Sequence, residues 1–267
     1  MNPSARQTCL ATLLVLCASG ALAEQSKQTL PTLPTLPTLP TLRIAQTSGM
    51  GYPLLTVEGG KVSGGFLHDL TERLAAELGT RAVQQLYPRR RIEPAVLGGQ
   101  ADLVCYSSPV WTRAPASQWT QAVLPQIERV VGPAERPAPG HLPEDLDGQR
   151  VAVLLGYSFP SLQPLMEAGR IKRINDTQSD NLFRLVSRDM ADVLIVSEAE
   201  IEGYFQRHPK ERERFVLSAK PYSVVDTHCL VSPKSRWAVA TVDKALHSLQ
   251  ASGEIARLAQ RYGMSMR

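Results

Sequence analysis

The apolar residues of this chain fall into short continuous runs and longer periodic stretches, which predict strands and helices in alternation. Runs with few polar residues predict strands over 42–47, 81–88, 101–107 and 126–132. An apolar residue recurs every fourth position over 69–78, so a helix is expected there, closed by Gly79. A shorter helix is expected over 91–99.

A second block with the same alternation follows a Pro- and Gly-rich loop at 133–148. It predicts strands over 150–156, 171–176 and 191–197, and helices over 161–169, 179–189 and 198–209. The chain then returns with strands at 214–220 and 227–233 and a helical pattern over 236–262. Two such blocks predict an α/β fold of two lobes, each a mainly parallel sheet flanked by helices. Ligands of such sheets bind outside the carboxyl ends of the strands.

The N-terminus has the pattern of a cleavable export signal. Arg6 supplies a positive charge, residues 10–18 supply a short apolar stretch, and Ala21-Leu22-Ala23 is a small-x-small cleavage site. Residues 1–23 are therefore predicted to be removed and the mature protein to be periplasmic. Residues 24–41 contain the repeat TLPTLPTLPTLP, which favours an extended linker that buries no core.

Composition and charge narrow the function classes. Lys and Arg number 29 against 25 Asp and Glu, a balance that does not fit a nucleic-acid surface. The run Arg89-Arg90-Arg91 is short and is interpreted as a solvated turn and helix start. Phosphate loops, HExxH motifs and Cys/His clusters with metal-ligand spacing do not occur, so no cofactor or metal is predicted.

Removal of the signal leaves two cysteines, Cys105 and Cys229, both in predicted strands. In an oxidising compartment such a pair can form a disulfide that joins the two strands. Two small buried hydrophobic side chains are the other interpretation, and the sequence leaves both open.

The segment 101–119, ADLVCYSSPVWTRAPASQW, carries the strongest chemical signal. It begins as a buried strand and then presents two hydroxyls, an indole and a guanidinium, from Ser107, Ser108, Trp111 and Arg113. A guanidinium binds a carboxylate through two parallel charge-assisted hydrogen bonds. This turn therefore predicts a pocket for an anionic or zwitterionic small molecule, although Ser-Ser-Pro is also ordinary turn chemistry.

A second candidate lies between the strand at 150–156 and the next helix. Tyr157 and Ser158 follow Gly156 there, and free backbone N–H groups at a helix start favour an anion. Ser158 can equally cap the helix. Tyr52 and Trp111, both in loops, are candidate apolar walls.

The order of these segments resembles that of family 3 periplasmic solute-binding proteins, which serve importers of polar amino acids. The resemblance rests on loose motifs in a fixed order over residues 42–263. Those motifs are Tyr52-Pro53, Gly65-Phe66 with Asp69-Leu70, Gly99 to Asp102, Trp111-Thr112-Arg113, DLDGQRVAVLLGYSF, RDMADVLIVSE and LQASGEIARLAQRYG.

The resemblance implies a two-lobed periplasmic-binding-protein fold of type II with two hinge crossings. Lobe 1 would comprise 42–125 and 225–267, and lobe 2 would comprise 126–224. Arg113 matches the arginine that grips the ligand's carboxylate in the family, after a segment one residue shorter. The family's ammonium-binding aspartate falls on Ser197, followed by Glu198. Either Glu198 replaces that aspartate or no ammonium is recognised; Glu198 also suits a first helical turn.

The resemblance implies an exported, monomeric receptor that closes on a small carboxylate-bearing ligand and delivers it to an ABC permease or a sensor. An enzyme on the same scaffold, like cyclohexadienyl dehydratase with Glu198 as general acid, is one alternative. An accessory module that keeps the fold but has a degenerate pocket is the other.

Overall fold

The computed structural model describes residues 39–264. The signal predicted for residues 1–23 and the linker up to residue 38 lie outside the described residues. Among the described residues, no helix has the length and apolar character needed to cross a membrane.

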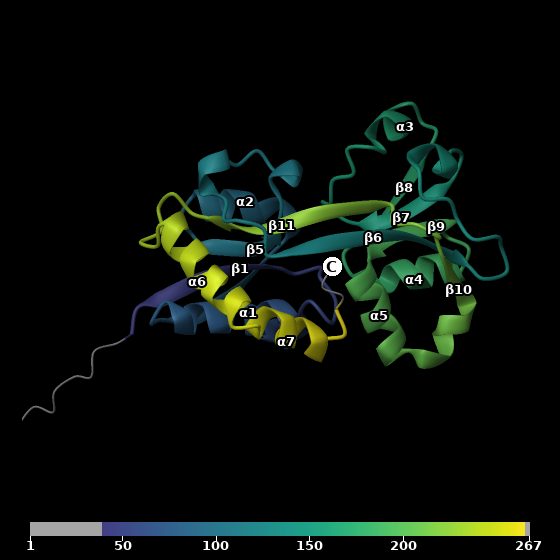
Figure 1. Cartoon of the computed structure of the whole chain (residues 1–267). Helices are drawn as coiled ribbons and strands as arrows, with labels where there is room; N and C mark the ends of the chain where they lie inside the picture. Colours follow the sequence, from purple (N-terminus) through teal and green to yellow (C-terminus); the bar gives the residue numbers. More distant parts are fainter. Residues whose placement is uncertain (1–38, 265–267) are drawn as a thin grey trace, which may run out of the picture. The chain divides into compact units, whose positions relative to one another are not determined.

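A mixed sheet runs through this part of the chain (Figure 1). The strands are hydrogen-bonded in the order β4-β1-β5-β11-β6-β9-β7-β8, and β10 pairs with β6. Their bounds are β1 Thr41–Thr47, β4 Arg81–Tyr87, β5 Leu103–Ser107, β6 Leu124–Pro133, β7 Arg150–Leu154, β8 Lys172–Asp176, β9 Val193–Ser197, β10 Phe215–Leu217 and β11 Ser223–Val231. A separate hairpin consists of β2 Thr56–Glu58 and β3 Lys61–Gly64.

Parallel pairing is confined to the two ends of the sheet. β1 pairs in parallel with β4 and β5, and β7 pairs in parallel with β8 and β9. Between them, β11 and β6 are antiparallel to their neighbours and to each other. β11 reaches β5 with residues 228–231 and β6 with residues 223–227, so these two strands connect the halves.

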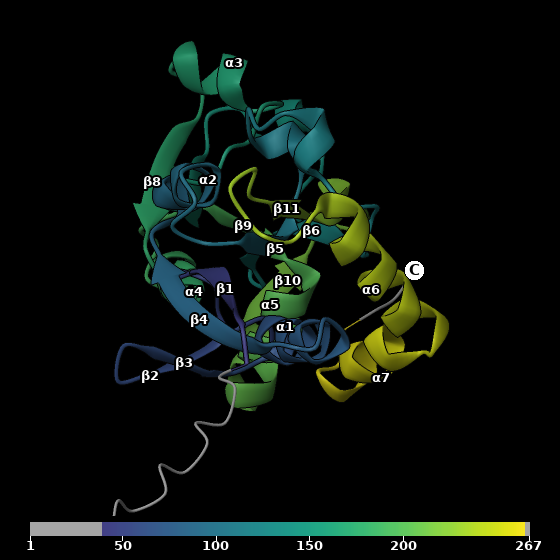
Figure 2. The same cartoon turned by 90° about the vertical axis from the view of Figure 1, so that its left-hand side faces the viewer.

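Helices cover both faces of the sheet. They are α1 Phe66–Glu77, α2 Arg89–Leu97, α3 Gln163–Glu167, α4 Ser179–Ser187, α5 Glu198–Arg207, α6 Val239–Ala251 and α7 Glu254–Arg261. In Figure 1, α2 and α3 lie above the sheet and the other helices lie below it; Figure 2 gives the view from the side. The helical pattern predicted over 236–262 is interrupted, because Gly253 adopts a left-handed conformation at φ 71° and α7 starts in a new direction.

Four clusters of buried apolar side chains follow this layout. The largest draws most of its buried members from β1, α1, β5, β11, α6 and α7, and includes Leu42, Phe66 and Leu246. Two others lie in the second half of the sheet, around Phe183 on one face and Leu162 on the other. The remaining cluster holds α2 against β1, β5 and β11.

Each half is fastened at the amino ends of its parallel strands by an Arg–Asp pair of the same geometry. Asp102 accepts hydrogen bonds from Arg43 N at 2.8 Å and from Nε and Nη2 at 3.0 and 2.8 Å. Asp192 accepts the corresponding bonds from Arg150 at 2.7, 3.1 and 2.8 Å. These bonds hold the pKa of Asp192 well below its ordinary value.

Candidate functional site

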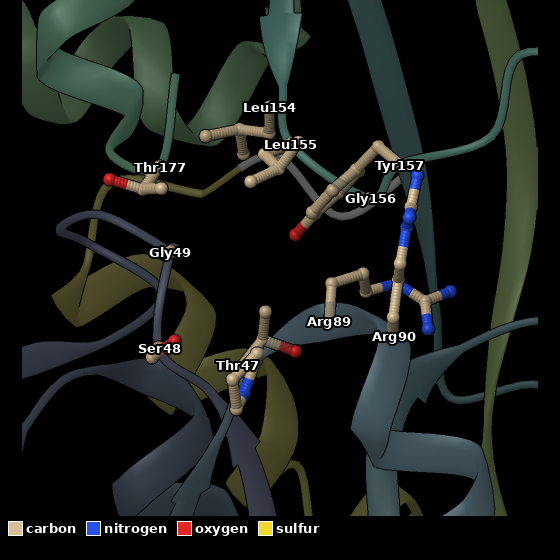
Figure 3. A pocket seen from close by; sticks show the side chains of 11 residues that line it. Thr47, Ser48, Gly49, Arg89, Arg90, Leu154, Leu155, Gly156, Tyr157 and Thr177 are labelled. Atoms are coloured by element: carbon tan, nitrogen blue, oxygen red, sulfur yellow. The ribbon is translucent and has the colours of Figure 1, made fainter. Parts of the chain in front are cut away.

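The loops that follow the parallel strands of both halves meet at two adjoining cavities. Cavity A, of about 150 Å³, is lined by Thr47, Ser48, Gly49, Pro88, Arg89, Arg90, Leu154, Leu155, Gly156, Tyr157 and Thr177 (Figure 3). Cavity B, of about 20 Å³, is lined by Thr47, Met50, Arg89, Ile92, Val104, Tyr106, Ser107, Trp111, Gln126, Glu128, Tyr157 and Ser158. Carboxyl ends of parallel strands are where α/β sheets bind ligands.

Arg89 and Tyr157, together with Thr47, line both cavities. Arg89 opens α2 directly after β4, and Tyr157 follows β7 in the other half. The Arg89 guanidinium lies over the Tyr157 ring, with Cζ 5.7 Å from the centroid, a cation–π contact. Among the described residues, the Arg89 side chain has no salt bridge. Its charge is therefore available to a ligand.

A row of polar side chains crosses the middle of the sheet beside cavity B. Glu128 on β6 is in register with Ser223 on β11 and with Ser197 on β9, so the three side chains share one face. The Ser223 hydroxyl donates to Glu128 Oε2 at 2.6 Å, and Gln126 Nε2 donates to Oε1 at 3.0 Å. Glu128 is 9% exposed, and burial raises its pKa more than the hydrogen bonds from Ser223 and Gln126 lower it.

Glu200 is a second buried carboxyl group, in the first turn of α5. Ser197 Oγ donates to its Oε2 at 2.7 Å, and Gly51 N donates to Oε1 at 3.3 Å from the other half of the sheet. Ser197 Oγ in turn accepts from Glu200 N at 3.3 Å, which is the N-cap hydrogen bond of α5. Burial raises the pKa of Glu200, and its charge contributes to the raised pKa of Glu128.

Tyr106 lies at the end of β5 with φ 57°, a conformation that bulky residues rarely adopt. Its side chain is buried and lines cavity B. Burial raises the pKa of the Tyr106 hydroxyl, and the nearby charge of Glu200 raises it further. Such backbone outliers persist where the surroundings impose them, and they cluster at ligand sites.

The structure brings four of the residues predicted from the sequence to cavity B. Ser107, Trp111, Tyr157 and Ser158 line it together. Ser108 is buried beside them but is not among the lining residues of either cavity.

Two further predicted residues lie elsewhere. Tyr52 lines a different hollow, where its ring meets Tyr262 edge-on and Arg207 lies 5.5 Å from its centroid. Arg113 is exposed and is not among the lining residues of cavities A and B; its backbone N–H donates to Glu93 Oε1 at 3.0 Å.

Ser197 and Glu198 have structural partners. Ser197 caps α5 and is buried. Glu198 accepts a hydrogen bond from Arg129 Nε at 2.7 Å, and this ion pair occupies both charges. Arg129 is adjacent to Glu128 on β6, so its side chain points to the opposite face of the sheet. The counter-charge of Glu198, the Arg129 guanidinium, therefore lies on the face of the sheet opposite to the Glu128 side chain.

Cys105 on β5 and Cys229 on β11 form a disulfide. It lies one residue before Tyr106 in the sequence, between two strands that are also hydrogen-bonded. The disulfide holds the strand end that carries Tyr106 and Ser107.

Several lining residues were not singled out from the sequence: Arg89, Tyr106, Gln126 and Glu128. Arg89 was interpreted as part of a solvated turn. Its position just after the carboxyl end of a predicted strand was the available signal. For Glu128, the signal was a carboxylate inside the apolar strand QIERVVG. Within the described part of the chain, no group of His, Cys, Asp and Glu side chains is arranged to hold a metal ion.

Solved structures share this architecture. The substrate-binding protein of an amino acid ABC transporter is 19% identical, with a TM-score of 0.67 over 84% of this chain and 99% of that one. The ancestral amino acid-binding protein AncCDT-1, a precursor of cyclohexadienyl dehydratase, is 20% identical, with a TM-score of 0.66 over 83% and 94%. A histidine kinase sensor domain with similarity to periplasmic binding proteins is 17% identical, with a TM-score of 0.68 over 83% and 95%. No curated protein matches the sequence.

The class of protein follows from these findings. The α/β fold is that of the periplasmic binding proteins, and the predicted fold class is confirmed. The family model of bacterial extracellular solute-binding proteins, family 3, matches residues 47–265. The chain belongs to this family, so the resemblance inferred from its motifs is confirmed.

Proposed function

We propose that this protein is an exported receptor that closes on a small polar ligand bearing a carboxylate, an amino acid or a related acid. The observation that carries the proposal is Arg89. It lies where loops from both halves meet, and among the described residues no carboxylate pairs with it. In this proposal Arg89 grips the ligand's carboxylate, and Ser107, Trp111, Tyr157 and Ser158 form the walls.

The position of Glu128 supports the proposal that the ligand carries an amino group. Glu128 lines the same cavity as Arg89, and its donors, Ser223 and Gln126, are neutral. An ammonium would supply the missing counter-charge, and its charge would favour the ionised carboxylate. In this proposal Glu128 takes the role of the family's ammonium-binding aspartate, in whose place this sequence has Ser197.

The small free volume of cavity B favours a mechanism in which the two lobes close around the ligand. Cavity B has about 20 Å³ of free space, room for little more than a water molecule. A ligand must therefore enter when the walls separate, and its contacts with both halves then stabilise the closed form. The lobes proposed are residues 42–125 with 225–267, and 126–224, connected through β6 and β11.

Delivery of the ligand to a membrane partner is the remaining part of the proposal. The similar structures include a protein of an amino acid ABC transporter and a sensor domain of a histidine kinase. These similar structures support a permease or a sensor as the partner. In this proposal the protein is periplasmic and monomeric, which is compatible with either partner.

A thermal-shift screen over amino acids and small acids tests the proposal. We expect at least one compound to raise the Tm of the wild-type protein, and Arg89→Ala to abolish that shift. Arg113→Ala is the comparison, because the family resemblance assigns the carboxylate to Arg113. Loss of the shift in Arg113→Ala alone would move the carboxylate site to that residue. Failure of every compound would contradict a receptor and favour an accessory module.

In the dehydratase alternative, Glu200 replaces Glu198 as the candidate general acid. Glu198 is occupied by Arg129, whereas Glu200 is buried with a raised pKa, as a general acid requires. The similarity to a dehydratase precursor keeps this candidate open to test. Incubation with prephenate or arogenate, followed by absorbance, decides it; unchanged substrate excludes it.

A further inference from the structure

Cavity A is lined by two arginine side chains and by no carboxylate. Arg89 and Arg90 come from the first turn of α2, and the other lining residues are apolar, hydroxyl-bearing or glycine (Figure 3). Glu128 lines cavity B and is not among the lining residues of cavity A. The free space of about 150 Å³ has room for a group the size of a carboxylate.

The positive charge around cavity A is not neutralised by protein groups. Within residues 39–264, neither Arg89 nor Arg90 has a salt bridge. Arg173 on β8 approaches from the other half, where it donates to the Tyr157 and Leu154 carbonyls. Burial lowers the pKa of Arg173, and the charge of Arg90 lowers it further, which shows that the two cations repel each other.

The local sequence adds to this unfavourable charge. Arg89, Arg90 and Arg91 occupy the first turn of α2, which contains no acidic residue. Cations at the positive end of a helix dipole are destabilising. Natural proteins break one or two such local rules at functional sites.

We propose that cavity A receives a second anionic group of the ligand, held by Arg90, and that the ligand is therefore a small acid with two negative groups. This inference rests on the proposed function, in which Arg89 holds the first carboxylate. Because Arg89 lines both cavities, one ligand spans them when the Arg89–Tyr157 contact opens. The second anion also relieves the repulsion between Arg90 and Arg173.

Pairs of acids and their amides test this inference by calorimetry. The pairs are L-glutamate and L-glutamine, L-aspartate and L-asparagine, and succinate and succinamate. The members of each pair have nearly the same size and differ by one negative charge. We expect the wild-type protein to bind the acid of at least one pair about tenfold more tightly than its amide, since a charge-assisted hydrogen bond is stronger than a neutral one.

Arg90→Gln should bring the acid-to-amide affinity ratio toward one and change the amide's Kd by less than about twofold. Arg91→Gln is the matched control, because Arg91 is exposed, belongs to the same helical turn and lines neither cavity. This control should keep the wild-type ratio.

The outcomes separate the two proposals. Equal affinity for acid and amide overturns the second anionic subsite and leaves the proposed function standing. Binding of none of the six compounds overturns this inference, whereas the proposed function is decided by the wider thermal-shift screen. A ratio that Arg90→Gln leaves unchanged, or that Arg91→Gln lowers equally, removes Arg90 from the site.

A measurement without ligand checks the charge on which the inference rests. Arg90→Gln should raise the Tm of the empty protein above that of Arg91→Gln, because only Arg90 is repelled by Arg173. A Tm at or below that of Arg91→Gln contradicts the unneutralised cluster. This readout does not depend on which compound is the natural ligand.

Discussion

The hydroxyl of Ser223 donates to Oε2 of Glu128 at 2.6 Å, and the two residues are 95 positions apart in sequence. The bond joins β11 to β6, the strands that connect the two halves of the sheet. Ser223 is one of the two side-chain donors to the buried Glu128 carboxyl group. The same hydrogen bond therefore belongs to the candidate site and to the connection between the two halves of the sheet.

Ser223→Ala should therefore lower the free energy of unfolding. A buried acceptor left without its donor costs about 1–3 kcal/mol. Urea denaturation at neutral pH measures the loss. Ser117→Ala, at an exposed serine, is the control and should stay within about 0.5 kcal/mol of wild type. Equal stabilities of the two variants would show that the Ser223 bond contributes nothing.

Stability should fall as pH rises through the raised pKa of Glu200. The ordinary pKa is 4.5, and burial raises it in the folded state, so the folded protein holds a proton that the unfolded chain has released. The free energy of unfolding then decreases with pH above 4.5. The groups that face Glu200 are Ser197, Gly51, Ser179, Tyr106 and Glu128.

Glu200→Gln removes this titration. Its unfolding free energy minus that of wild type should increase as pH rises above 4.5 and level off above the raised folded-state pKa, as measured by denaturation at several pH values. Glu202→Gln is the control on the same helix, since Glu202 forms a solvent-accessible ion pair with Arg212. A difference that is flat with pH for both variants would mean that Glu200 is not perturbed.

The disulfide between Cys105 and Cys229 should stabilise the fold substantially. It closes a loop with a sequence separation of 124 residues. Loss of such a bridge is expected to cost about 2–5 kcal/mol. The double variant Cys105→Ala/Cys229→Ala, compared with wild type in urea, measures the cost. Two free thiols titrated in the unreduced wild-type protein would show that the bridge does not form.

Gly156 brings the loop after β7 against the start of α2. Its φ is +83°, and a Cβ there would lie 3.2 Å from Arg90 Cγ and 3.3 Å from Arg89 Cβ. Gly156→Ala should lower the Tm and weaken ligand binding, because the loop must shift away from both arginines. A left-handed alanine alone costs about 1 kcal/mol.

Gly79→Ala supplies the comparison for this variant. Gly79 also has a positive φ, +66°, but a Cβ there meets no atom within 4 Å. The excess loss of stability in Gly156→Ala over Gly79→Ala therefore measures the contact with α2. Equal losses in the two variants would mean that the loop does not press on Arg89 and Arg90.

The sequence predicted the strands and helices well where apolar patterns are strong and local. β9 and α4 are examples, since an apolar run and a helical apolar face specify them without reference to distant residues. The break between α6 and α7 was missed because both sides of Gly253 have helical apolar spacing, although the buried face changes phase there, from Leu246 and Leu249 to Ile255 and Leu258. The left-handed conformation of Gly253 is not encoded in hydrophobic spacing.

The site was predictable only in part. Ser107 and Trp111 follow a strand end, which the sequence reveals. Arg89 enters the cavities only because the loop after β7 folds over it, and Glu128 faces cavity B only because of its register with β11 and β9. Both facts depend on contacts between distant segments, which no local pattern contains.

The twin anchors Arg43–Asp102 and Arg150–Asp192 lie at the strand ends opposite to the binding loops. None of these four residues is among the lining residues of cavities A and B. Substitutions among the residues that line the cavities can therefore change ligand specificity without destabilising these anchors. Ligand specificity is then free to diverge in evolution while the fold is retained.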